Sequence, residues 1–418
     1  MSRYREQIIV GLEIGTTKIC AVIGEVRNDG TLQILGIGKA DSCGVRKGEI
    51  VDFDNASKCI YDALNQAEQL CDVTIEEVFV AVTGSHIQSF SNRGSVPISG
   101  EDREVSEDDI DEVMKNAKSV STPPDHTIIH SILEHYYIDG KAGIKNPIGQ
   151  LGTVLEANYH IVHGKELRIK NTIKCVKSLD IKVDDVVLSS LASAQAILKS
   201  EEKEQGAIVI DIGGGTTDYI VYSEGAVRHT GTFAVGGDHV TNDVSIGLKL
   251  PLRQAEKMKV EHGSISRRSV AVSRTIHLKG EVGFAEREVE SSQLCAIMRD
   301  RMEETLQLVY KDLKKQGLLP FVRCGVFLTG GCSRTPGLVE LADEVFGMPI
   351  HLTTAQKSGG VVQVYENPEY STAIGLINYG KKLLNERDLD QHQPMGRIGR
   401  WVFDMLQTAK SFVVSILF

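Results

Sequence analysis

The sequence predicts an α/β protein made of two related domains, with a smaller inserted subdomain and a separate C-terminal helix. A glycine turn between two apolar runs occurs near Gly15 and again near Gly214. Apolar runs typical of strands alternate with segments of helical spacing between and beyond these turns. The final residues, 397–418, carry apolar side chains at helical spacing. A repeated turn of this kind indicates a duplicated domain.

The stretch 206–219, GAIVIDIGGGTTDY, predicts a strand, a glycine turn and a second strand. Glycines can adopt positive φ, and they lack the Cβ atoms that would keep a ligand away from the backbone. Successive N–H groups can then converge on a phosphate. Asp211 stands where its carboxylate could hold a hydrated Mg²⁺ through water. The predicted phosphate ligands are Gly213, Gly214, Gly215, Thr216 and Thr217.

A second copy of the pattern lies near the N-terminus, in GLEIGTTK at 11–18. Again an acidic residue, Glu13, precedes an aliphatic residue, a glycine and two threonines. One copy alone has a simple alternative, a glycine-rich hairpin without a ligand. The repetition favours two phosphate turns that close on one nucleotide. The candidates here are Gly15, Thr16, Thr17 and Lys18, with Glu13 as a further candidate near the metal and phosphates.

Length and composition suit a two-domain globular protein. The chain has 418 residues, of which 41% are hydrophobic and 24% charged. A formal net charge of -10 argues against general nucleic-acid binding, because no large basic field is available. The eight cysteines show no metal-ligand spacing, and the N-terminus enters a strand directly, so we expect a reducing, cytoplasmic setting.

The first domain is expected at 1–84, 165–187 and 365–384. Asp52, Asp54 and Asn55 mark the start of the helical segment at 54–71, and any of them could cap it. The strands expected in this domain are 8–12, 19–26, 32–39, 77–83 and 183–188, and the helices are 54–71, 165–176 and 371–384.

An inserted α+β subdomain is expected at 85–164, where the composition changes. Acidic residues cluster at 101–112, and we interpret them as a solvated helix face. Ser106 is placed to cap a helix at 107–118. Strands are expected at 128–139 and 155–162.

The second domain is expected at 188–364. It opens with LASAQAIL at 191–198, a small-residue helix suited to close packing between domains. A third turn follows the strand at 326–329, and a Gly-Gly turn at 236–237 leads into a helix. Glu256 and Lys259 lie one helical turn apart, as in an ordinary surface ion pair. The other elements expected are helices at 241–248, 252–260 and 291–316 and strands at 269–278 and 287–290.

The C-terminal part reads as a flexible polar linker at 385–396 and an amphipathic helix at 397–418, roughly 30 Å long. A membrane span is disfavoured because Arg400, Asp404 and Lys410 would lie in hydrocarbon. A helix docked on the domain core remains an alternative. A helix lying on an anionic bilayer fits the pattern best. The residues expected to contact the membrane are Ile398, Arg400, Trp401, Val402, Met405, Leu406, Lys410, Phe412, Val413, Ile416 and Leu417.

The three turns resemble the phosphate 1, phosphate 2 and adenosine motifs of the actin, Hsp70 and sugar-kinase superfamily. That resemblance implies an actin-like duplicated ATPase fold with ATP and Mg²⁺ as cofactors. It also implies that Glu256 and Lys259 embrace the adenine and ribose. The remaining cofactor-binding candidates, expected near the adenosine, are Gly236, Gly237, Gly330, Gly331 and Cys332.

With the insertion and the tail, stretches such as GIKNPIG at 143–149 and YSTAIGLINYGK at 370–381 resemble the FtsA family of bacterial cell-division proteins. The resemblance implies a peripheral membrane protein on the cytoplasmic face of the inner membrane, at the division septum. The resemblance implies self-association into actin-like polymers and anchoring of FtsZ, whose C-terminal tail would bind at 230–316. It also implies that 85–164 supports self-association and recruits later divisome membrane proteins.

The sequence leaves open whether the protein hydrolyses ATP and whether it transfers phosphate to a small molecule. Glu13 stands where most relatives have Asp, so we expect ATP binding with slow or no hydrolysis. The alternative function is an ATP-dependent sugar-type kinase of the same superfamily, which would need a general base such as Asp238. A kinase has no use for a membrane helix, which favours the cell-division interpretation.

Overall fold

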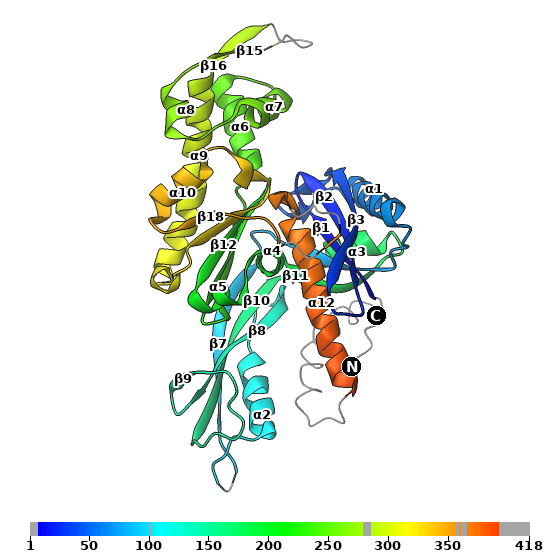
Figure 1. Cartoon of the computed structure of the whole chain (residues 1–418), viewed down its shortest axis with the longest axis vertical. Coiled ribbons are helices and arrows are strands. Elements are labelled where there is room, and N and C mark those ends of the chain that lie inside the picture. Colours follow the sequence, from blue (N-terminus) through cyan, green and yellow to red (C-terminus); the bar gives the residue numbers. More distant parts are fainter. Residues whose placement is uncertain (1–6, 101, 279–285, 357–358, 361–365, 393–418) are drawn as a thin grey trace.

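A computed structural model describes residues 7–100, 102–278, 286–356, 359–360 and 366–392 (Figure 1). The molecule is elongated, with the inserted subdomain at one end and α6 to α9 at the other. The expected membrane helix at 397–418 lies outside the described residues. None of the described helices is both long and apolar enough to cross a membrane.

The first domain is built on a five-stranded sheet of order β11-β6-β1-β2-β3. Strand β1 pairs antiparallel with β2 and parallel with β6, and the last pair before the turn is Ile14 with Ile19. Of the three cap candidates, Asp52 caps α1, accepting a hydrogen bond from the backbone N–H of Asn55. The elements are β1 Gln7–Ile14, β2 Lys18–Val26, β3 Leu32–Asp41, β4 Val45–Arg46, β5 Glu49–Ile50, α1 Phe53–Cys71, β6 Glu77–Val82, α3 Glu166–Lys177, β11 Lys182–Leu188 and α12 Ser371–His392.

The second domain repeats this arrangement in a sheet of order β14-β13-β12-β17-β18. Strand β12 pairs antiparallel with β13 and parallel with β17, and Ile212 with Thr217 is the last pair before the turn. The predicted duplication is therefore visible in strand order and direction. The helices are α4 Ser189–Ile197, α5 Ser200–Gln205, α6 Gly237–Leu248, α7 Leu252–His262, α8 Arg267–Ala271, α9 Ser291–Lys315 and α10 Leu338–Phe346.

The strands of this half and the short 3₁₀ turns of the chain complete the list. They are β12 Ala207–Ile212, β13 Thr217–Ser223, β14 Ala226–Phe233, β15 Thr275–Leu278, β16 Arg287–Glu290, β17 Val326–Thr329, β18 Ile350–Leu352, η1 Leu319–Phe321, η2 Gly331–Arg334 and η3 Pro368–Tyr370.

The inserted subdomain has its own sheet, of order β7-β10-β8-β9, and its own core under α2. Ser106 forms a capping box with Asp109, which is 1% exposed, so one member of the acidic cluster is structural. The elements are β7 Gln88–Pro97, α2 Glu107–Lys118, β8 His126–Ile138, β9 Lys141–Ile144 and β10 Val154–Lys165.

Helices α4 and α12 lie against each other, and α4 contacts strands of both sheets, as the small residues of 191–198 predicted (Figure 1). A Cβ atom added at Gly375 would lie 1.8 Å from the carbonyl oxygen of Ala192, so only glycine permits this approach. Chain order makes both helices crossovers between the halves. Helix α4 leads from β11 towards β12, and α12 follows the second domain and packs on β1.

Two expectations differ from the structure. Residues 385–392 of the predicted linker belong to α12, and 393–396 lie outside the described residues. The linker sequence is polar but contains good helix formers and no glycine or proline before Pro394, so polarity alone was a poor signal for a linker. The strand predicted at 269–278 is a short helix, α8, followed by β15.

Candidate nucleotide-binding site

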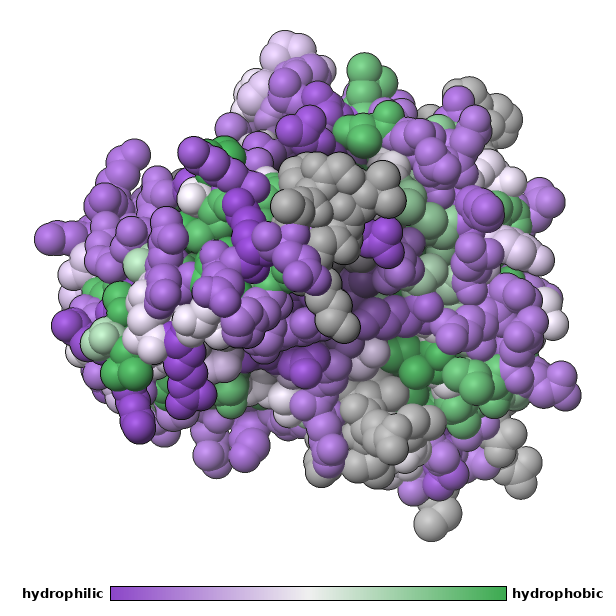
Figure 2. Space-filling view, turned by 90° about the horizontal axis from the view of Figure 1, so that it is seen from above, coloured by the Kyte–Doolittle hydropathy of each residue, from purple (hydrophilic) through white to green (hydrophobic). Residues whose placement is uncertain are grey.

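The turns after β1 and β12 meet at one cavity of about 250 Å³ between the two domains. Most of the residues predicted to bind the nucleotide and its metal line it together. These are Glu13, Gly15, Thr16, Thr17, Lys18, Asp211, Gly213, Gly214, Gly215, Thr216, Gly330 and Gly331. Seen from the β15–β16 end, the surface is predominantly hydrophilic and its hydrophobic residues form separate patches (Figure 2).

The glycines of the second turn are needed because the first turn lies close to them, not because they adopt positive φ. Gly213, Gly214 and Gly215 are not among the described residues with positive φ, so that part of the prediction was wrong. A Cβ atom at Gly214 would lie 2.3 Å from Cγ2 of Thr17, and one at Gly215 would lie 2.2 Å from Oγ1 of Thr16. The two turns therefore touch across the cavity, and side chains at these positions would force them apart.

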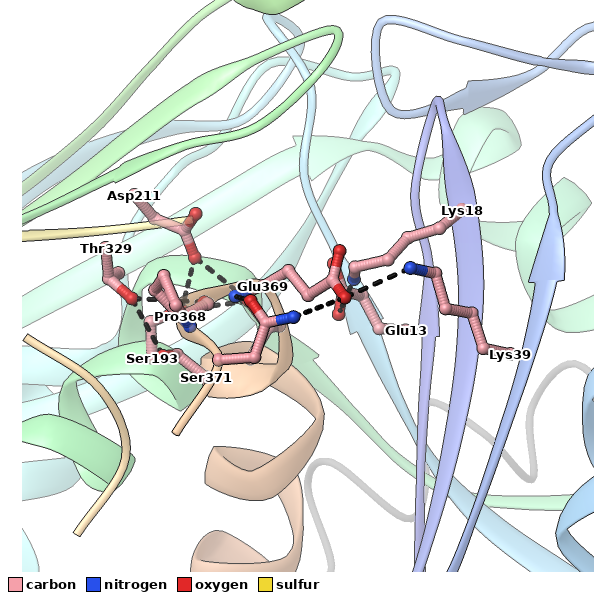
Figure 3. Close-up of polar contacts among 11 residues, drawn as sticks. Glu13, Lys18, Lys39, Ser193, Asp211, Thr329, Pro368, Glu369 and Ser371 are labelled. Carbon is pink, nitrogen blue, oxygen red and sulfur yellow. Dashed lines mark hydrogen bonds and ion pairs between the residues drawn. The ribbon is translucent and has the colours of Figure 1, made fainter. Parts of the chain in front are cut away.

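The first carboxylate of the cavity, Glu13, is paired with a cation. Lys18 Nζ lies 2.7 Å from Glu13 Oε2, and both side chains are largely buried (Figure 3). Burial raises the pKa of Glu13, and the charge of Lys18 opposes that rise. Burial would lower the pKa of Lys18, yet the Glu13 carboxylate holds it above its ordinary value. Lys18 thus faces the cavity wall as an ammonium group rather than pointing to solvent.

The second carboxylate, Asp211, is held by hydroxyl groups. Ser193 Oγ donates to Oδ2 at 2.6 Å (Figure 3). Thr372 Oγ1 donates to the same oxygen at 3.0 Å. Burial raises the pKa of Asp211, and the hydrogen bonds from Ser193 and Thr372 act against that rise. Of these two carboxylates, Glu13 therefore has its own cation and Asp211 does not.

A third carboxylate, Asp218, connects the domains and was not predicted as a site residue. It accepts hydrogen bonds from Thr83 at the end of β6 and from Thr216 and Thr232 in the second domain. Burial raises the pKa of Asp218 to about 6, despite these hydrogen bonds. Its place in GGGTTD is a signal that the sequence analysis could have used.

Other lining residues come from positions far apart in the chain, for which the sequence carried no signal. Lys39 Nζ lies 3.0 Å from Glu369 Oε1, and these residues come from β3 and η3 (Figure 3). The other polar lining residues that were not predicted are Lys39, Asp41, Thr83, Ser189, Glu369 and Thr372, and the remaining ones are Ile14, Gly48 and Ala81.

Of the predicted adenosine-side residues, Gly330 and Gly331 line the cavity, and the others adjoin it. Lys259 Nζ lies 2.6 Å from Glu256 Oε2 and 3.2 Å from the carbonyl oxygen of Gly237. The backbone N–H of Gly237 donates to the carbonyl oxygen of Gly213 at 3.0 Å. Cys332 Sγ lies 3.4 Å from that same oxygen. Gly236, Gly237, Glu256, Lys259 and Cys332 are thus packed behind the second phosphate turn.

Thr217 differs from its predicted role. Its hydroxyl donates to the carbonyl oxygen of Val235 at 2.8 Å, and the residue is completely buried. Strand alternation explains this, since Thr217 begins β13 and points to the opposite face from Thr216.

The carboxylates of the cavity suit a magnesium ion held mainly through water. Within the described part of the chain, no group of three or more His, Cys, Asp or Glu side chains is arranged to hold a metal ion. Glu13 and Asp211 offer two carboxylates, which is the protein share typical of Mg²⁺ sites that keep several waters. The donor set therefore fits a hydrated Mg²⁺ beside phosphates.

Two protein-family models match this chain. The family model "Cell division protein FtsA" matches residues 208–375, and the model "SHS2 domain inserted in FTSA" matches residues 84–163. The FtsA of Pseudomonas aeruginosa is 38% identical over 374 residues, covering 90% of this chain and 89% of that protein. The FtsA of Escherichia coli strain K12 is 35% identical over 404 residues, covering 95% and 96%.

Solved structures with little sequence identity share the fold. A PilM-PilN type IV pilus biogenesis complex matches with a TM-score of 0.63 at 14% identity, covering 91% of this chain and 99% of that one. MreB5 of Spiroplasma citri bound to ADP matches with a TM-score of 0.56 at 14% identity, covering 91% and 98%. A MamK double helical filament matches with a TM-score of 0.50 at 10% identity, covering 90% and 98%.

These likenesses support the actin-like fold and do not favour the sugar-kinase alternative. The insertion at 84–163 coincides with the predicted subdomain at 85–164. With more than one third of residues identical over about nine tenths of the chain, this protein belongs to the FtsA family of cell division proteins.

Proposed function

We propose that this cell division protein binds Mg·ATP in the cavity between its two domains. One observation carries the proposal: both glycine turns and the carboxylates of Glu13 and Asp211 converge on the same cavity. MreB5, which shares the fold, is described as bound to ADP, which supports a nucleotide here. The backbone N–H groups of 16–18 and 214–216 would hold the phosphates, since those of Gly15 and Gly213 close the turns onto Lys18 and Thr216.

The other predicted residues take supporting roles in this proposal. Glu256, Lys259 and the turn of Gly330, Gly331 and Cys332 would enclose the adenosine. A hydrated Mg²⁺ would neutralise the phosphates beside Asp211, with Glu13 further along the cavity wall. Because Glu13 is already paired with Lys18, it is a poor base for activating water, so we expect slow or no ATP hydrolysis.

We further propose a scaffold function on the cytoplasmic face of the inner membrane at the septum. The chain would self-associate into actin-like polymers, for which the MamK filament offers a precedent of the same fold. Residues 397–418 would bind anionic lipids peripherally. The subdomain at 230–316 would bind the C-terminal tail of FtsZ, and 85–164 would contact other copies and later divisome membrane proteins.

Co-sedimentation with anionic vesicles tests the membrane and nucleotide parts together. The full chain is compared with a chain ending at His392, which keeps α12 intact, each with and without Mg·ATP. We expect only the full chain to sediment, and Mg·ATP to increase the sedimented fraction by favouring polymers. Sedimentation of both chains, or of neither, would contradict the membrane role of 397–418. Calorimetry on the shorter chain measures Mg·ATP binding without lipid.

A further inference from the structure

The Asp211 carboxylate is oriented by two side chains that lie far from it in the sequence. Ser193 belongs to α4 and Thr372 to the first turn of α12. Both hydroxyls donate to Oδ2, at 2.6 and 3.0 Å, and their oxygens lie 2.9 Å apart. Ser193 is completely buried, Thr372 is 5% exposed and Asp211 is 9% exposed. This is a closed triangle of polar atoms beneath the cavity.

The triangle leaves one carboxylate oxygen for a ligand. Among the described residues no hydrogen-bond donor is found for Oδ1 of Asp211, and Asp211 lines the cavity. Two donors on the same oxygen restrict rotation of the carboxyl group about its Cβ–Cγ bond. Since both donors are neutral, they orient the carboxylate without cancelling its charge. A cation in the cavity would therefore meet an oriented and uncompensated oxygen.

Helix packing sets the positions of the two hydroxyls. Ala192, next to Ser193, contacts Gly375, which lies three residues after Thr372. Asn378 Nδ2 donates to the carbonyl oxygen of Gln195 at 3.2 Å and holds the next turn of the contact. Because α4 and α12 are the crossovers between the halves, a shift of one domain relative to the other would move Thr372 relative to Ser193.

We propose that Ser193 and Thr372 are positioning residues of the metal side of the site. They orient Asp211 towards a hydrated Mg²⁺ and make that orientation depend on the packing of α4 against α12. The inference rests on the proposed function, because it presupposes that Mg·ATP occupies the cavity. Partners of this kind, behind a metal ligand, typically change metal affinity or activity by about 10- to 100-fold when they are removed.

The test measures ATP affinity by calorimetry in the full-length protein, once with Mg²⁺ and once with EDTA. The variants are Ser193→Ala, Thr372→Val and Thr372→Ser. Ser190→Ala is the matched control, since Ser190 is also on α4, is 1% exposed, and its hydroxyl has no partner among the described residues. Urea unfolding of each variant shows whether it is folded.

We expect Ser193→Ala and Thr372→Val to weaken Mg·ATP binding about tenfold or more. Binding of metal-free ATP should change much less, because Asp211 then has no cation to hold. Thr372→Ser keeps the hydroxyl and should bind as the wild type does, as should Ser190→Ala.

The outcomes distinguish a failure of the proposed function from a failure of the positioning role. A wild-type chain that binds no Mg·ATP would overturn the proposed function, and the positioning role with it. Wild-type binding combined with equal losses in Mg²⁺ and EDTA would overturn the positioning role alone. The positioning role is also overturned if Thr372→Ser binds Mg·ATP as weakly as Thr372→Val does. Packing of the methyl group, rather than the hydroxyl, would then account for the loss of affinity.

Discussion

Glu13 and Asp211 occupy the same place in the two halves of the molecule, one residue before the end of the central strand, yet they are compensated differently. Glu13 is paired with the ammonium group of Lys18, and its cross-strand neighbour is Cys20. Asp211 is held by neutral hydroxyls, and its cross-strand neighbour is a second carboxylate, Asp218. The first half thus brings its own cation to the cavity.

This difference indicates where a cation would bind. At the wall formed by the first domain, Lys18 and Lys39 pair with Glu13 and Glu369. At the wall formed by the second domain, Asp211 and Asp218 receive hydrogen bonds only from hydroxyl groups, among the described residues. Duplication therefore preserved the geometry of the turns, while the electrostatics of the two walls diverged. We expect Mg²⁺ on the Asp211 side.

The largest effect on stability should come from breaking the Glu13–Lys18 pair. Lys18→Met leaves a largely buried carboxylate without its cation, and removal of one partner of such a pair typically costs about 3–5 kcal/mol. Urea unfolding without nucleotide measures the loss. The double variant Glu13→Gln/Lys18→Met should recover most of it, because no uncompensated charge remains. Equal stability of Lys18→Met and wild type would show that the pair is screened through the cavity.

The second prediction concerns Asp218, whose pKa burial raises to about 6 from an ordinary 3.8. A carboxyl group with a raised pKa binds its proton more tightly in the folded state. It therefore contributes stability that is complete below pH 4 and is lost as the pH rises through 6. A shift of about two units corresponds to a change of about 3 kcal/mol at most.

Unfolding of wild type and Asp218→Asn across pH 3.5–7 checks this dependence. The stability of the wild type relative to the variant should fall between pH 4 and 6 and then become constant. Parallel curves would mean that the hydroxyls of Thr83, Thr216 and Thr232 already compensate the charge of Asp218 fully.

The smallest effect is expected at Lys39. Its side chain is 40% exposed, so its pair with Glu369 at 3.0 Å is well solvated. Exposed pairs of this kind contribute about 0–1 kcal/mol. Lys39→Met should therefore lower the free energy of unfolding by at most about 1 kcal/mol, much less than Lys18→Met does. A loss as large as that of Lys18→Met would show that both lysines belong to one buried network.

Local pattern was sufficient for much of the architecture. The two strand–turn–strand motifs, the helix at 107–118 with its Ser106 cap, and the small-residue helix before the second turn are all confirmed. Each depends on residues close in sequence, where spacing and capping express local physical preferences. The linker prediction was wrong for 385–392, because polarity is compatible with both a helix and a coil.

The sequence by itself determined that this is a duplicated α/β protein of the FtsA family, with two phosphate-type turns and a carboxylate before each. Only the tertiary structure decided how those carboxylates are compensated. Ser193 and Thr372 are 179 residues apart, and Lys39 and Glu369 are 330 residues apart. Such contacts depend on how two domains and two crossing helices pack, which no local spacing encodes. The chain thus specifies its turns locally and the charge balance of its cavity through packing.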